Sequence, residues 1–198
     1  SGIFTPLASP AVGVAKLIRA NPRNGHHRVY AEGLSQGNGV VRAPDGTVYA
    51  SNDLTSTIDR IGTDGRVERG WYDQSPGNGL AMSADGRTLY ANVSFPDTRI
   101  VAIDTATGKG RTHFRPPAGM NWTSLDALDD LDIDRRGRLY APLYFGGQVL
   151  RVDSDGSHCA IAAGLTLPAG ISLGRPGAGF SADSCLLYTS PSPRDATL

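Results

Sequence analysis

The stretch GNGVVRAPDGTVYASND, Gly37 to Asp53, carries the pattern that decides the fold. Asn-Gly at residues 38–39 is a strong signal for a tight turn between strands, and Asp-Gly at residues 45–46 is a second turn signal. The same Asn38 could instead place an amide oxygen at the end of a sheet, where a metal ion would take it. A single copy of the stretch is compatible with a bend and with a ligand, so further copies are needed to decide.

The same pattern occurs in two further copies in the chain. In each copy a polar residue stands eight positions before a glycine: Asn38 before Gly46, Asn78 before Gly86, and Asp129 before Gly137. Each glycine leads into a β-type segment, and these segments are TVYASN (47–52), RTLYAN (87–92) and RLYAPL (138–143). Two more β-type segments joined by a glycine turn follow in every copy. Residues 16–34 and 167–174 look like incomplete copies at the two ends.

The period of the repeat predicts the fold. The three copies begin 40 and 51 residues apart, and each holds four short strands and no helical pattern. A repeat of about this length with four strands is typical of a blade in a β-propeller. A β-sandwich is the alternative, but it would not repeat the same eight-residue spacing three times. We therefore predict an all-β chain of four-stranded antiparallel sheets arranged as propeller blades.

The repeat also predicts a common location for three polar residues. In a blade, the residue that heads the first strand lies at one end of the central channel, so Asn38, Asn78 and Asp129 should converge on one axis. Their amide and carboxylate oxygens are hard donors, which favour Ca²⁺, with Mg²⁺, Mn²⁺ or Zn²⁺ as substitutes. The connection 115–129 carries Trp122, which either forms an apolar wall beside that axis or fills a gap between blades.

Composition narrows the range of partners. The chain has 198 residues with 19 basic and 19 acidic side chains, so it offers no positive field for nucleic acid. No apolar stretch is long enough to span a membrane. Its two cysteines, Cys159 and Cys185, form neither a disulfide framework nor a metal-ligand spacing. These observations disfavour nucleic-acid and membrane partners and leave the oligomeric state and the compartment open.

Two segments carry a resemblance to a known family: GNGLAMSADGRTLYAN (77–92) and LDDLDIDRRGRLYAPLYFGGQVLRVDSDG (128–156). They resemble the family of senescence marker protein (regucalcin), gluconolactonases and luciferin-regenerating enzyme. The resemblance implies a six-bladed propeller with one divalent cation in its central channel. It also implies that Asn38, Asn78 and Asp129 are three of the metal ligands. The family's fourth ligand, a glutamate from an earlier blade, is expected upstream of Ser1.

The resemblance further implies a divalent-metal-dependent hydrolase that acts on a lactone or a related ester. Asp129, the only carboxylate among the three, is the candidate base as well as a ligand. Candidates for substrate contact are Gln36, Trp122 and Asp130. The pocket departs from the family pattern, because Gln36 replaces an arginine, Gly39 replaces an aspartate, and Asp130 replaces a glycine. The alternative is a non-catalytic propeller that binds a ligand or a protein.

The final segment, CLLYTSPSPRDATL (185–198), breaks the repeat. Back-translated, residues 185–195 resemble the transposase end and adapter of a sequencing library, so we interpret 185–198 as non-native and 1–184 as a partial propeller domain. A Ser/Pro-rich tail is the alternative. About four of six blades are then expected, with open sheet edges at both ends. We accordingly expect this chain to lack robust activity.

Overall fold

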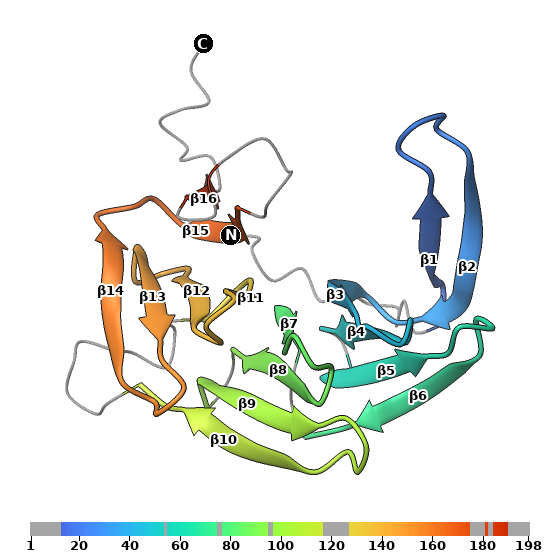
Figure 1. The fold of residues 1–198 in the computed structure, drawn as a ribbon, viewed down its shortest axis with the longest axis horizontal. Coiled ribbons are helices and arrows are strands. Elements are labelled where there is room, and N and C mark those ends of the chain that lie inside the picture. The colour runs from blue at the N-terminus through green and yellow to red at the C-terminus, as the bar shows by residue number, and fades with distance from the viewer. Residues whose placement is uncertain are drawn as a thin grey trace, which may run out of the picture.

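The computed structural model describes residues 13–53, 55–74, 77–94, 97–116, 127–174, 181 and 184–189. Within these ranges the chain forms strands β1 to β16 and contains no helix (Figure 1). Consequently no helix of the described chain is long and apolar enough to cross a membrane. Trp122 lies outside the described residues, so its two alternative places, beside the axis or in a gap between blades, both stay predictions.

Three complete four-stranded antiparallel sheets follow one another along the chain. In each sheet the strands are ordered as they occur in the sequence. The first sheet consists of β3 (Gly37–Arg42), β4 (Val48–Asn52), β5 (Thr57–Ile61) and β6 (Val67–Tyr72). The second consists of β7 (Leu80–Met82), β8 (Thr88–Val93), β9 (Arg99–Asp104) and β10 (Gly110–Phe114). The third consists of β11 (Asp132–Ile133), β12 (Leu139–Leu143), β13 (Gln148–Val152) and β14 (His158–Ala163).

A two-stranded sheet stands at each end of this series. The first pairs β1 (Ala15–Ala20) with β2 (His27–Leu34), and the last pairs β15 (Pro168–Leu173) with β16 (Cys185–Thr189). Together the sheets form an open arc in which the innermost strands β3, β7 and β11 face the centre (Figure 1). The predicted incomplete propeller is confirmed. Because β16 lies within 185–198, that segment begins as a strand, and its non-native origin stays a prediction.

The glycines that mark the repeat close the same turn in each sheet. Gly46, Gly86 and Gly137 have φ values of 96°, 72° and 78°, in the left-handed region that favours glycine. Each donates its N–H to the residue three positions earlier, at 3.0, 2.9 and 3.0 Å respectively. The three copies are therefore in the same structural register, which makes Asn38, Asn78 and Asp129 equivalent positions.

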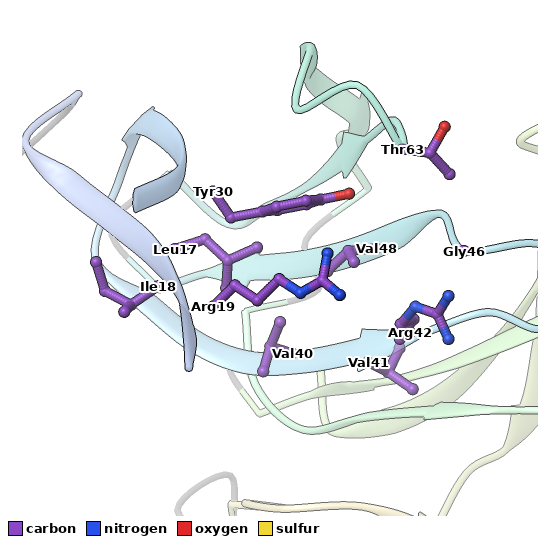
Figure 2. A pocket seen from close by; sticks show the side chains of 10 residues that line it. All are labelled: Leu17, Ile18, Arg19, Tyr30, Val40, Val41, Arg42, Gly46, Val48 and Thr63. Carbon is purple, nitrogen blue, oxygen red and sulfur yellow. The ribbon is translucent and has the colours of Figure 1, made fainter. Parts of the chain in front are cut away.

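The inner strand at one end of the arc, β3, is more exposed than the inner strands of the next two sheets. Val40, Leu80 and Leu131 each lie two residues after a repeat head, yet their exposed fractions are 56%, 6% and 4%. A groove of about 660 Å³ lies beside Val40, between β1–β2 and β3–β4 (Figure 2). Among the described residues, no inner strand precedes β3, and this accounts for the exposure of Val40. None of the three repeat heads lines the groove.

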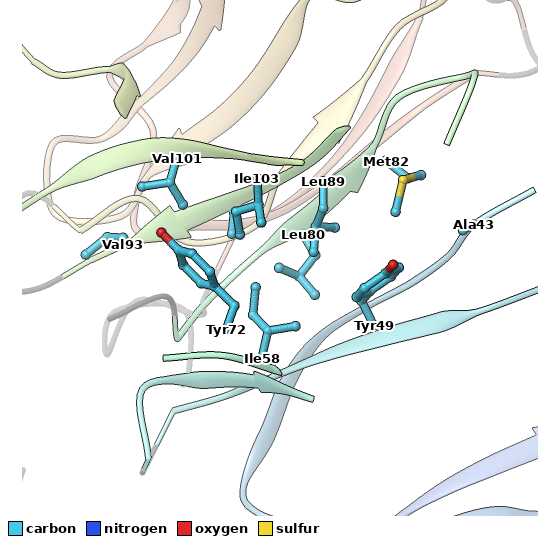
Figure 3. Packing of buried hydrophobic residues seen from close by; sticks show 11 residues of the cluster. Ala43, Tyr49, Ile58, Tyr72, Leu80, Met82, Leu89, Val93, Val101 and Ile103 are labelled. Carbon is cyan, nitrogen blue, oxygen red and sulfur yellow. The ribbon is translucent and has the colours of Figure 1, made fainter. Parts of the chain in front are cut away.

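The core lies between neighbouring sheets. Ile58 of the first sheet packs against Leu89 and Ile103 of the second, and all three side chains are fully buried (Figure 3). The middle strands β4 and β12 are buried along their whole length, although period-two patterning would predict one solvated face. Adjacent sheets cover both faces of β4 and β12. Alternate side chains of each strand therefore pack against different neighbouring sheets.

A candidate metal centre at the heads of the inner strands

The three repeat heads lie at the beginnings of neighbouring inner strands. Asn38 is in β3, Asn78 comes two residues before β7, and Asp129 comes three residues before β11. The strands β3 and β7, and the strands β7 and β11, are in contact. The Gly79 N–H donates to the Asp129 carbonyl at 2.9 Å. The segments that carry Asn78 and Asp129 are thus joined directly through their backbones.

Asn38 makes a contact that a simple bend residue would not need. Its Nδ2 donates to Oδ2 of Asp53 at 3.0 Å, and the Asp53 N–H donates to the Gln36 carbonyl at 3.0 Å. Asp53 follows β4 directly, so the end of the second strand supports the head of the first. Surrounding protein partly desolvates Asp53 and raises its pKa, while the bond from Asn38 opposes this rise. Its side chain still reaches solvent.

Asn78 presents an unused acceptor. Its Nδ2 donates to Oγ of Ser94 at 3.1 Å, whereas its Oδ1 is buried and has no hydrogen-bond partner within the described part of the chain. A buried polar atom without a partner costs about 1–3 kcal/mol. A hard cation is a partner that an amide oxygen can take in this setting. Asn78 therefore fits the predicted ligand type.

Asp129 is the carboxylate that the site perturbs most. Burial raises its pKa to about 6, and the negative charges of Asp130 and Asp53 act in the same direction. A hydrogen bond from Asn78 lowers the pKa and only partly offsets these effects. The cluster therefore penalises the ionised carboxylate, and a bound cation would remove that penalty. The pKa of Asp129 therefore depends on Asp130 and Asp53, which raise it, and on Asn78, which lowers it.

The two other described candidates for substrate contact have different surroundings. Asp130 accepts from its own neighbour Leu131 through Oδ1 at 2.8 Å and from Ile171 in β15 through Oδ2 at 2.9 Å. Its carboxylate thus joins the segment just before β11 to β15, and Asp130 also lines a cavity of about 410 Å³ between the inner strands. Gln36 is exposed. Substrate contact by Asp130 and Gln36 remains a prediction.

Sequence reasoning overlooked Asp53 and Ser94. They follow the turn glycines Gly46 and Gly86 by seven and eight residues, and each accepts a bond from the side-chain amide of its own head residue. The available signal was this shared position after the second strand of the sheet. A difference of one residue in spacing obscured it, because the two residues do not pair when the copies are aligned on their turn glycines.

The donor set is unusual for a metal site recognised from sequence. Among the residues that the structure describes, no three His, Cys, Asp or Glu side chains come together in a way that could hold a metal ion. A cation at the repeat heads would therefore depend on the amide oxygens of Asn38 and Asn78 together with the Asp129 carboxylate. Such an all-oxygen set suits Ca²⁺ better than Zn²⁺.

The family model described as SMP-30/Gluconolactonase/LRE-like region matches residues 50–179, well over half of the chain. The chain belongs to this family. The predicted family membership is thus confirmed, and the matched range includes Asn78 and Asp129. Among curated proteins, no sequence matches the chain.

Solved structures agree with this family at the level of the fold. A regucalcin from Agrobacterium tumefaciens, described as a calcium-binding protein, has a TM-score of 0.62 at 20% identity, covering 80% of this chain and 57% of its own. A gluconolactonase from Xanthomonas campestris has a TM-score of 0.61 at 21% identity, covering 79% and 58%. Virginiamycin B lyase from Staphylococcus aureus has a TM-score of 0.60 at 16% identity, covering 88% and 63%. This member of the family therefore spans less than two thirds of each of these propellers.

Asp53→Asn tests the electrostatic coupling within the site. The substitution keeps an acceptor oxygen for Asn38 but removes a negative charge that raises the pKa of Asp129. We expect the pKa of Asp129 to fall, and cation affinity to weaken by less than about tenfold because the charge acts through partly solvated space. Carboxyl NMR titration and calcium titration measure the two effects. An unchanged Asp129 titration would contradict the coupling.

Proposed function

We propose that the chain carries the cation-binding part of a divalent-metal-dependent hydrolase for a lactone or a related ester. The observation that carries this proposal is the pairing of a buried, unpartnered amide oxygen on Asn78 with the electrostatically penalised carboxylate of Asp129. Asn38, held by Asp53, would supply the third oxygen. The family, together with a regucalcin and a gluconolactonase among its structural neighbours, supports the substrate class.

In this proposal the residues of the chain divide the chemistry. Asn38, Asn78 and Asp129 would hold the cation, which would supply Lewis-acid polarisation of the lactone or ester carbonyl. Asp129, the only carboxylate among the three, would take the proton from the attacking water. Water would add to the carbonyl carbon of a lactone, the bond from that carbon to the ring oxygen would break, and the proton held by Asp129 would pass to the ring oxygen, giving a hydroxy acid. Asp53 and Ser94 orient the side chains of the two asparagines.

The test begins with the cation. We expect calcium to bind the 198-residue chain by calorimetry, Asn78→Ala and Asp129→Asn to abolish the binding, and Asp73→Asn, at an exposed position after β6, to leave it intact. Lactone hydrolysis is followed by pH-stat with and without EGTA, both for this chain and for a longer form that includes the additional blades of its relatives. Turnover by this chain should be weak at most, because its sheet edges are open.

The outcomes separate the alternatives. Hydrolysis by the longer form that persists unchanged in EGTA would rule out the metal-dependent mechanism. Absence of both cation binding and hydrolysis in the longer form would favour a non-catalytic propeller that binds a ligand or a protein. Vigorous, chelator-sensitive turnover by the 198-residue chain would show that an open arc suffices.

A further inference from the structure

Two side chains at the end of β8 reach across to the next sheet. Asn92 and Ser94 are two positions apart, so they point to the same side of the extended chain. Val93, between them, points to the opposite side and is fully buried in the apolar cluster shared with the first sheet. One end of one strand thus has a polar side that meets the third sheet and an apolar side that meets the first.

The polar side holds three consecutive carbonyl groups. Oγ of Ser94 donates to the Leu128 carbonyl at 2.6 Å. Nδ2 of Asn92 donates to the carbonyls of Asp129 and Asp130, both at 2.9 Å. Asn92 is fully buried, so these bonds are made away from water, where an unpaired carbonyl is costly. The backbone on both sides of the Asp129 side chain is therefore fixed by β8.

The same two residues also contact the Asn78 segment. Oγ of Ser94 accepts from Nδ2 of Asn78 at 3.1 Å, and the Asn92 N–H donates to the Gly79 carbonyl at 3.0 Å. Ser94 thus accepts from one proposed ligand while it donates to the residue before the other. Asn92 and Ser94 therefore link the Asp129 segment to the Asn78 segment.

The residues at the position of Asn92 in the other two sheets offer fewer side-chain hydrogen bonds to the next sheet. Tyr49, Tyr90 and Tyr140 align the second strands, and this places Ser51, Asn92 and Pro142 at the same position. Ser51 makes one bond to the next head, from its Oγ to the Asn78 carbonyl at 2.7 Å. Proline has no side-chain donor to offer. The fullest set of bonds therefore occurs where Asn78 and Asp129 meet.

We propose that Asn92 and Ser94 form a clamp of positioning residues that sets the placement of Asp129 relative to Asn78 and thereby the affinity for the cation. This inference rests on the metal site of the proposed function. In this role the clamp acts through the two ligands that it holds. Residues that orient metal ligands in this way typically alter metal affinity by 10- to 100-fold when replaced.

The experiment compares clamp variants with a neighbour that faces the other way. Asn92→Ala, Ser94→Ala and the double variant remove the clamp, Ser94→Thr keeps the hydroxyl, and Asn92→Ser leaves one donor, as Ser51 does. Val93→Ala is the matched control, since it loses buried contacts on the same strand without touching the clamp. Calcium affinity is measured by calorimetry, and the Gly79 amide resonance, which reports its bond to the Asp129 carbonyl, is followed by NMR without metal.

We expect Asn92→Ala and Ser94→Ala to bind calcium about tenfold or more weakly and to shift the Gly79 amide resonance. Ser94→Thr and Val93→Ala should bind calcium nearly as the parent does. Clamp variants that bind as tightly as the parent while Asp129→Asn does not would overturn the proposal. If the parent binds no cation, the metal site itself fails and, with it, the role of the clamp in affinity. The Gly79 resonance then decides whether the clamp positions Asp129 at all, and an unchanged resonance would refute that as well.

Discussion

Replacing Asp129 with asparagine is expected to abolish cation binding and to stabilise the cation-free chain at neutral pH. The variant keeps the shape of the side chain and removes its charge. Binding is lost because the only carboxylate among the three repeat heads is gone. Stability rises because the ionised carboxylate is held beside Asp130 and Asp53 in a partly buried place. Such a cost is the expected trade-off if Asp129 serves the proposed cation site.

The direction of the pH dependence follows from the raised pKa. Folding moves the pKa of Asp129 from 3.8 to about 6, so the folded state binds the proton more tightly than the unfolded state. This contribution to stability is fully present below pH 3.8 and is lost as the pH rises through about 6. At pH 7 the ionised group then costs about 1–2 kcal/mol once solvent screening of this partly open site is allowed for. Asp129→Asn avoids that cost.

Urea denaturation in EGTA from pH 4 to pH 8 measures the effect as the difference between the parent and the variant. The other carboxylates titrate in both proteins, so their contributions largely cancel. The parent should lose stability relative to Asp129→Asn as the pH rises. The control Asp73→Asn, which removes an exposed carboxylate, should follow the parent. Adding calcium should reverse the order, since only the parent gains binding energy. Equal stability of parent and Asp129→Asn at every pH would refute this electrostatic account.

Much of the fold could be predicted because the repeat is defined by residues that lie close together in the sequence. The turn glycines require a left-handed backbone, the strands alternate, and the heads stand at a fixed distance before the turn. These signals lie within a single copy of the repeat, so a comparison of the copies is enough to align Asn38, Asn78 and Asp129.

The features that the sequence does not reveal depend on contacts between copies. Asp53 and Ser94 differ in residue type and in their distance from the turn glycines, so aligning the copies on those glycines does not pair them. The bond from Ile171 to Asp130 joins residues 41 positions apart, and no pattern within one copy reports it. Burial of both faces of β4 and β12 likewise arises from neighbouring sheets. Side chains that hold one sheet to the next are invisible to periodicity within a strand.

Replacing Gly79 with alanine is expected to be the most destabilising single change near the site. A Cβ at this position would overlap the backbone of Asp130 and Leu131, with the Asp130 Cα only 2.6 Å away. Backbone atoms cannot turn aside as a flexible side chain can, so the second and third sheets would have to separate. That separation would break the bond from the Gly79 N–H to the Asp129 carbonyl. We expect a loss of about 3 kcal/mol or more in the free energy of unfolding.

Alanine substitutions at two other glycines, both in β3, test the cause of this loss of stability. A Cβ on Gly39, the equivalent residue of the first sheet, would lie 2.8 Å from the Asn78 carbonyl oxygen, whereas one on Gly37 would have no neighbour closer than 4.0 Å. Urea denaturation should therefore rank Gly79→Ala as most harmful, Gly39→Ala as intermediate at about 1–3 kcal/mol, and Gly37→Ala as nearly neutral. Equal effects at Gly79 and Gly37 would mean that the loss of glycine flexibility, and not the approach of the sheets, sets the cost. The predicted ranking would instead show that the inner strands meet through their backbones at Gly79, the same contact that brings Asn78 and Asp129 together.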